Sequence, residues 1–93
     1  MTDITGNRFT TIAGAVGEVY RVTLTAAGHR IDIFNNTENN ILVSDKNSFT
    51  QSASGSPYLT IPPDGGYNGL VSVSDKLYIK TLGVGTVSIA EHS

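Results

Sequence analysis

The chain has 93 residues and a mass of 9.8 kDa, which is enough for one domain and too little for a second independent core. Only 15% of the residues are charged, six basic against eight acidic, so the sequence lacks the basic surface that nucleic-acid binding needs. The absence of cysteine excludes disulfides, thiolate metal sites and cysteine nucleophiles.

Neutral polar residues take the place of the charged residues that most soluble domains carry. Val, Ile and Thr together make up 27 residues, and these residue types favour sheet over helix. No stretch approaches the roughly 20 apolar residues of a membrane-spanning helix. The first residues, Met1 to Asp3, do not begin a secretory signal. We therefore expect a protein made in the cytoplasm, with no membrane partner.

Residues 1–17 show no clean alternation of apolar and polar side chains. Glycines interrupt this stretch, and Ile4, Phe9 and Ile12 are spread along it. Two interpretations stay open, an edge strand of the domain or an extended arm that docks on another subunit. Residues 18–93 are expected to form the β-sandwich domain itself.

Apolar residues alternate with polar ones in short runs, which is typical of half-buried strands. Seven strands are expected, at residues 18–25, 30–34, 41–44, 58–61, 70–73, 76–82 and 86–90. The predicted connections are an Asn-rich turn at 35–40, a long polar loop at 45–57, a turn at 62–66 and a hairpin loop at 83–85. No segment has apolar residues spaced at the 3.6-residue period of an amphipathic helix.

The pattern predicts an all-β fold, a single small antiparallel β-sandwich, jelly-roll-like or Ig-like, with about seven strands and little or no helix. The predicted core consists of the inward residues of these strands: Tyr20, Val22, Leu24, Ile31, Ile33, Ile41, Val43, Leu59, Ile61, Val71, Val73, Leu77, Ile79, Val87 and Ile89.

Residues that carry chemistry are few and scattered. Asp45, Asp64 and Asp75 are all expected at turns, where aspartate is common without any bound cation. His29 is expected to face solvent in a turn, and Glu18 and Glu91 are a carboxylate pair only if folding brings them together. No serine has the surroundings of a nucleophile elbow. We therefore expect no enzyme, metal or cofactor.

Aromatic side chains are better candidates for contacts with a partner. Phe49 and Tyr67 are expected in loops, and Tyr58 is out of phase with the core face of its strand. Tyrosine is frequent at protein interfaces and can stack on a sugar while its hydroxyl donates a hydrogen bond. The alternative is that such rings only shield one sheet face from water.

Four stretches resemble the small β-sandwich virion accessory proteins of tailed bacteriophages, which decorate the capsid or sit at the neck. They are Arg30–Thr37, Ile41–Ser44, Tyr58–Gly66 and the segment from Leu77 to Ile89, and the likeness covers about residues 18–91. Each stretch is a strand-and-turn pattern. The resemblance implies a non-enzymatic structural role in the virion, with the major capsid or neck protein as partner.

Two functions from different classes are therefore expected. The first is a virion structural protein that self-associates as a homo-oligomer, most simply a trimer, through sheet edges and residues 1–17, because a net charge of −2 gives little repulsion between copies. The second is a carbohydrate- or receptor-binding module. The predicted partner contacts are Ile4, Phe9, Ile12, Phe49, Tyr58 and Tyr67.

Overall fold

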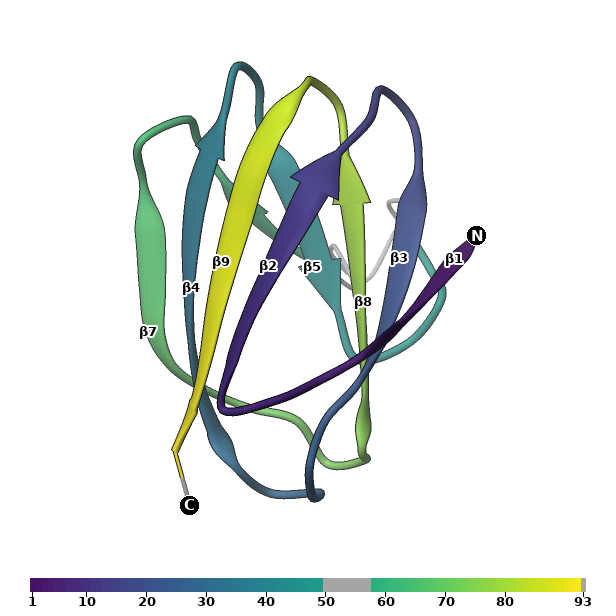
Figure 1. Cartoon of the computed structure of the whole chain (residues 1–93), viewed down its shortest axis with the longest axis vertical. Coiled ribbons are helices and arrows are strands. Elements are labelled where there is room, and N and C mark those ends of the chain that lie inside the picture. The colour runs from purple at the N-terminus through teal and green to yellow at the C-terminus, as the bar shows by residue number, and fades with distance from the viewer. Residues whose placement is uncertain (50–57, 93) are drawn as a thin grey trace, which may run out of the picture.

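Two facing β-sheets make up the protein (Figure 1). The computed structural model describes residues 1–49 and 58–92, in which there are nine strands and no helix, so none that could span a membrane. In chain order the strands are β1 (Thr2–Thr5), β2 (Phe9–Gly14), β3 (Val19–Thr23), β4 (Arg30–Thr37), β5 (Ile41–Ser44), β6 (Leu59–Ile61), β7 (Gly66–Val71), β8 (Lys76–Thr81) and β9 (Gly85–His92).

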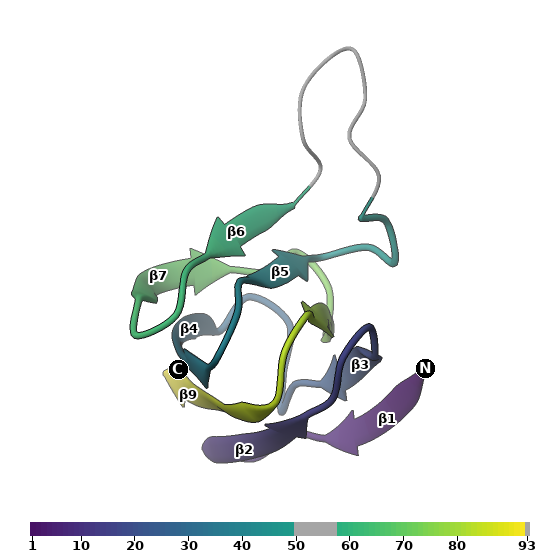
Figure 2. The same ribbon diagram turned by 90° about the horizontal axis from the view of Figure 1, so that it is seen from above.

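The strand order is that of a jelly roll with one added strand. One sheet has the order β2-β9-β4-β7, and the other has the order β1-β3-β8-β5-β6. Without β1, these are the two interleaved four-stranded sheets of a jelly roll, built from two Greek keys. Figure 2 shows the two sheets enclosing one interior. The predicted all-β sandwich is confirmed, and of its two named forms the topology is jelly-roll-like.

The core lies between the sheets and consists almost entirely of β-branched and leucine side chains. Thirteen hydrophobic residues are buried there: Ile12, Tyr20, Val22, Leu24, Ile31, Ile33, Ile41, Val43, Ile61, Leu77, Ile79, Val87 and Ile89. Twelve of them belong to the predicted core. Leu59 is only partly buried, although it still packs against this cluster.

The first seventeen residues are the largest difference from the seven expected strands. They contain β1 and β2, which form one edge of each sheet. β1 pairs in parallel with β3, the one parallel pair among the described strands. Ile12 is 1% exposed and completes the core, so it cannot make the partner contact predicted for it.

The predicted turn at 35–40 is wrong at its start, because β4 continues to Thr37. The Asn35 side chain is fully buried, and its amide nitrogen donates to the carbonyls of Asn39 and Ile61, 2.9 Å away in each case. Its amide oxygen accepts from the backbone N–H and the hydroxyl of Thr37. These four hydrogen bonds satisfy the amide completely and tie β4 to β6 in the opposite sheet.

Val71 and Val73 were expected in the core but are 56% and 84% exposed. β7 has a bulge where it pairs with β4, since Ile31 and Ile33 lie opposite Leu70 and Tyr67. The extra residue on β7 reverses the alternation beyond it. Leu70 therefore packs against the core in place of its neighbour Val71.

One connection also differs from the prediction. Residues 82–84 join β8 to β9, which lie in different sheets, so this segment is an arch and not a hairpin loop. Strand β5 pairs with β8 on one side and β6 on the other, so it is not one of the sheet edges open to association. Residues 50–57 of the predicted polar loop lie outside the described residues.

The buried amide of Asn35 gives a direct test of how the sheets are joined. Asn35→Ala removes the side-chain donor to the Ile61 carbonyl and the acceptor for the N–H of Thr37, whereas the Asn39 carbonyl still accepts from the Thr37 hydroxyl. We expect a loss of about 3 kcal/mol in the free energy of unfolding. The control is Asn36→Ala on the exposed face of the same strand, expected to change stability by less than about 0.5 kcal/mol. Chemical denaturation measures both, and equal losses would contradict this role for Asn35.

Candidate functional site

The outer face of the four-stranded sheet carries the most distinctive group of exposed side chains. Every second residue of β2, β9 and β4 points away from the core, as the alternating burial of these strands shows. The outward residues are Phe9, Thr11, Ala13, Thr86, Ser88, Ala90, His92, Arg30, Asp32, Phe34 and Asn36. Two phenylalanines and small or polar residues thus share one face.

The cross-strand register places these side chains in rows. Phe9 on β2 lies opposite Ala90 on β9, which lies opposite Asp32 on β4. In the next row, Ser88 separates Thr11 from Phe34. The two phenylalanines are therefore on either side of β9, two inter-strand spacings or roughly 10 Å apart across the sheet.

Small side chains between large ones leave a shallow depression, which we call the furrow. It has a volume of about 560 Å³, and its lining includes Phe9, Thr11, Asp32, Phe34, Ser88 and Ala90. Phe9 is 72% exposed and Phe34 is 45% exposed. The Arg8 guanidinium lies 5.5 Å from the centre of the Phe9 ring, a cation–π contact that restrains this side chain.

Asp32 provides a fixed carboxylate beside the furrow. One of its oxygens accepts from the backbone N–H of Gly69 at 2.9 Å, and the other lies 2.9 Å from Nε2 of His92. The hydrogen bond from Gly69 is the main cause that lowers the pKa of Asp32 below its ordinary value of 3.8, and the contact with His92 adds to it. The carboxylate is thus held ionised and in one orientation.

A second depression, the basic hollow, adjoins the furrow at the end of the sheet that carries His92. Its volume is about 600 Å³, and its lining consists of Asn7, Arg8, Thr25, His29, Arg30, Glu91 and His92. Both histidines and two of the three arginines of the chain are among these residues.

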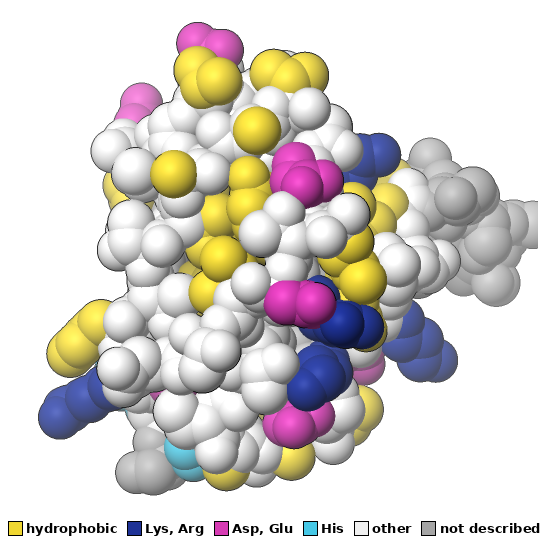
Figure 3. Space-filling model, turned by 45° about the vertical axis from the view of Figure 1, so that its right-hand side comes forward, with side chains coloured by type: hydrophobic (Ala, Val, Ile, Leu, Met, Phe, Trp, Pro, Cys, Tyr) yellow, Lys and Arg dark blue, Asp and Glu magenta, His cyan; other side chains and the backbone are white. Residues whose placement is uncertain are grey.

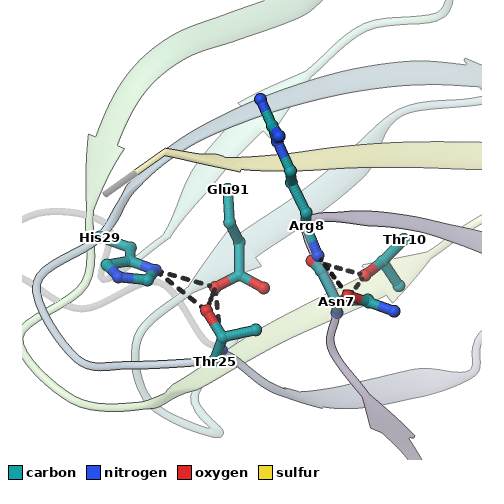
Figure 4. Close-up of polar contacts among 6 residues, drawn as sticks. All are labelled: Asn7, Arg8, Thr10, Thr25, His29 and Glu91. Carbon is teal, nitrogen blue, oxygen red and sulfur yellow. Dashed lines mark hydrogen bonds and ion pairs between the residues drawn. The ribbon is translucent and has the colours of Figure 1, made fainter.

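Glu91 is the buried member of the basic hollow, with its side chain only 2% exposed (Figure 4). Its Oε1 accepts from the backbone N–H of Thr25 at 2.9 Å and from the Thr25 hydroxyl at 3.0 Å, and it lies 3.3 Å from Nδ1 of His29. Figure 4 shows the other oxygen, Oε2, pointing away from His29. Oε2 has no hydrogen-bond partner among the described residues.

Gly6 leaves the space that the Glu91 carboxylate occupies. A Cβ atom at Gly6 would lie 2.5 Å from the carbonyl oxygen of Thr23 and 3.1 Å from Oε2 of Glu91. Only glycine lets the chain between β1 and β2 pass so close to the end of β3. The predicted solvent-facing His29 is also wrong, since its side chain is 24% exposed and contacts Glu91.

Charged side chains on the opposite, N-terminal side of the molecule are interspersed by sign. In Figure 3, Lys and Arg side chains lie next to Asp and Glu side chains across the face that it draws. Arg21 and Asp3 form an ion pair of 2.6 Å, and Lys76 lies 3.7 Å from Asp75. The hydrogen bond between Asp3 and Arg21 lowers the pKa of Asp3.

The carboxylate pair and the metal site considered from the sequence both lack support in the described residues. Glu18 accepts a hydrogen bond from the Thr2 hydroxyl and lies 3.7 Å from the N-terminal amine, whereas Glu91 binds Thr25 and His29. Within residues 1–49 and 58–92, no group of three or more His, Asp or Glu side chains is arranged to hold a metal ion.

The residues predicted to contact a partner fall into separate places. Ile4 is half-buried on β1 and packs against the core, while Phe9 lines the furrow. Phe49 and Tyr58 come together with ring centres 6.1 Å apart. Tyr67 lies on β7 and is 42% exposed. Of these six residues, the structure thus brings Phe49 and Tyr58 into contact with each other.

Tyr58 also borders a third, smaller cavity at the side of the sandwich where β5 and β6 meet the end of β7. This cavity has a volume of about 260 Å³, and its lining includes Val43, Leu59, Leu70 and Leu77 but not Tyr67. Phe49, Tyr58 and Tyr67, the three aromatic residues expected to contact a partner outside residues 1–17, therefore do not line one cavity together.

Phe34 is the residue that the sequence analysis missed. It stands between Ile33 and Asn35, both buried, at an outward position of a strongly alternating strand. A large aromatic residue in the polar phase of such a strand is the signal that could have identified it.

Comparisons with known proteins identify the fold. No family model and no curated protein matches the chain. Among solved structures, it is similar to PliG, a periplasmic inhibitor of g-type lysozyme from Aeromonas hydrophila, with a TM-score of 0.63 and 12% identity over 98% of this chain and 96% of that one.

The chain is also similar to CBM_E1, a carbohydrate-binding module from a sugar cane soil metagenome that was solved with cellopentaose and a gadolinium ion. Here the TM-score is 0.55 and the identity 13%, over 100% of this chain and 92% of that one. At such identities, both similarities show the fold alone. Neither of these two proteins is named as a virion protein, so the resemblance to phage proteins stays a prediction.

Glu91 offers a test of the network behind the basic hollow. Glu91→Ala removes the acceptor for the buried N–H of Thr25, so we expect a loss of about 2–3 kcal/mol in the free energy of unfolding. Glu91→Gln keeps an acceptor oxygen of the same reach and should lose less than half as much. Thermal denaturation measures both, and an unchanged Glu91→Ala protein would contradict the network.

Proposed function

We propose that the protein is a non-enzymatic binding module that takes a carbohydrate chain in the furrow. The observation that supports this proposal is the pair of exposed rings, Phe9 and Phe34, on either side of a floor made by Ser88 and Ala90. Two phenylalanines exposed on one sheet face are more than the scattered single apolar residues that a domain surface normally carries.

The chemistry of the furrow suits a sugar. The C–H groups on one face of a pyranose pack against an aromatic ring, while its hydroxyls need donors and acceptors in the plane of the ring. The furrow offers both, because the hydroxyl of Ser88 lies between the two rings, the Thr11 hydroxyl lies beside Phe9 on β2, and the Asp32 carboxylate lies beside Phe34 on β4. The strand pairing fixes all of these groups in advance, which lowers the entropy lost on binding.

The comparisons support the proposal at the level of the fold, since a β-sandwich of this kind in CBM_E1 holds cellopentaose. The same fold in PliG inhibits a lysozyme, so the fold does not choose between a sugar and a protein as ligand. The size of the furrow favours the sugar. A stable protein partner would cover about 800 Å² of this chain, whereas the furrow is a depression of about 560 Å³, a volume typical of sites for small ligands.

The virion role, the trimer and the capsid or neck partner stay predictions beside this proposal. Strands β1 and β2 are indeed sheet edges, as an association through residues 1–17 requires.

Substitutions in the furrow test the proposal. Isothermal titration calorimetry against oligosaccharides selected on a glycan array should show about tenfold weaker binding for Phe9→Ala and for Phe34→Ala, because each loses one stacking surface. Ser88→Tyr should abolish binding by filling the furrow, and it should leave the melting temperature near that of the wild type because residue 88 points outward.

The matched control is Tyr58→Ala, which removes an aromatic ring from the third cavity. This variant should bind as the wild type does. Loss of binding in Tyr58→Ala with normal binding in Phe34→Ala would place the ligand at the third cavity and overturn the furrow as the site.

A further inference from the structure

The furrow and the basic hollow form one continuous surface. The guanidinium of Arg8, which lines the hollow, lies over the ring of Phe9, which lines the furrow. Asp32 of the furrow is hydrogen-bonded to His92 of the hollow. Arg30 and His92 are themselves cross-strand partners on the same outer face, one row beyond Asp32 and Ala90. A ligand that lies along the furrow and extends past Ala90 therefore reaches the basic side chains.

Three of the four carboxylate oxygens of this region have partners, and the fourth, Oε2 of Glu91, is buried. Both oxygens of Asp32 have partners, namely the N–H of Gly69 and His92. Glu91 is buried, and its Oε1 is bound by Thr25 and lies beside His29. Each carboxylate of the region is thus matched with a histidine of the region.

The arginines of the hollow lack such partners. Among the described residues, neither Arg8 nor Arg30 forms an ion pair with a carboxylate, whereas Arg21 on the other sheet pairs with Asp3 at 2.6 Å. Arg30 is exposed at the start of β4 and lines the hollow. Arg30 lies near enough to Asp32 to help lower the pKa of that carboxyl, but no described carboxylate forms an ion pair with either guanidinium. Two guanidinium groups therefore lie at one end of the furrow with hydrogen-bond donors that a ligand can use.

We infer that the glycan bound in the furrow carries an acid group, a carboxylate or a sulfate, that is held between Arg8 and Arg30 at its end. This inference rests on the proposed function and names the class of sugar. A guanidinium fork binds the oxygens of either acid group through paired, charge-assisted hydrogen bonds. The neutral part of the chain would then occupy the space between Phe9 and Phe34.

The test compares matched oligosaccharides at low ionic strength by calorimetry. The first pair is an oligogalacturonate and its carboxyl-reduced form, and the second is a chondroitin sulfate oligosaccharide and its desulfated form. We expect the acidic member of at least one pair to bind about tenfold more tightly than its counterpart, and the pair that responds identifies carboxylate or sulfate. The preference should shrink as salt is added.

Arg30→Gln removes one guanidinium of the hollow, and Arg30 is not among the residues that line the furrow. It should reduce the preference for the acidic member to less than about threefold while binding of the neutral member changes little. The control is Lys80→Gln, which removes the same charge from β8 in the other sheet and should keep the full preference.

Equal affinity for both members of both pairs, or an unchanged preference in Arg30→Gln, would overturn the acid-group inference and leave the proposed function standing. Absence of binding to all four oligosaccharides and to every neutral glycan on the array would overturn both.

Discussion

The pairing of β4 with β9 is the constraint on which the rest of the structure depends. Eight residues of each strand are matched, from Arg30 opposite His92 to Thr37 opposite Gly85. Because side chains alternate, a slip by one residue would move Ile31 and Ile33 out of the core and turn Phe34 inward. The register is fixed at one end by the buried amide of Asn35, which reaches β6 in the other sheet. The inner face of this strand pair thus makes the core, and its outer face makes the furrow.

Local alternation was enough to predict most of the fold. It identified the all-β sandwich and twelve of the thirteen buried hydrophobic residues, among them Val22, Ile79 and Ile89. It failed where a long-range contact overrides local preference. Asn35 is of a residue type common in turns, but its side chain is buried and donates to the carbonyl of Ile61 in the other sheet, 26 positions away, which keeps it in a strand. The bulge in β7 exposes Val71, and Gly69 within it, at a φ of +81°, is the residue type that often marks such a bulge.

The site was harder to predict than the fold because it depends on which strands become neighbours. Phe9 and Phe34 are 25 positions apart, and only the insertion of β9 between β2 and β4 brings them to one face. The same step gathers Arg8, Arg30 and His92, which carry no motif in the sequence. Phe9 was predicted to contact a partner, but as part of an arm that docks on another copy of the chain. Phe49 and Tyr58 do meet, since both flank one loop, and they lie away from the furrow.

The central claim is that the outer face of the four-stranded sheet binds a sugar chain. The most direct measurement is a titration of the isotope-labelled protein with an oligosaccharide that binds, followed by backbone amide chemical shifts. The account predicts shifts that concentrate at Phe9, Thr11, Phe34, Ser88 and Ala90, with those of β5, β6 and β8 unchanged. Shifts confined to the strands of the five-stranded sheet, or to Tyr58 and its neighbours, would contradict it.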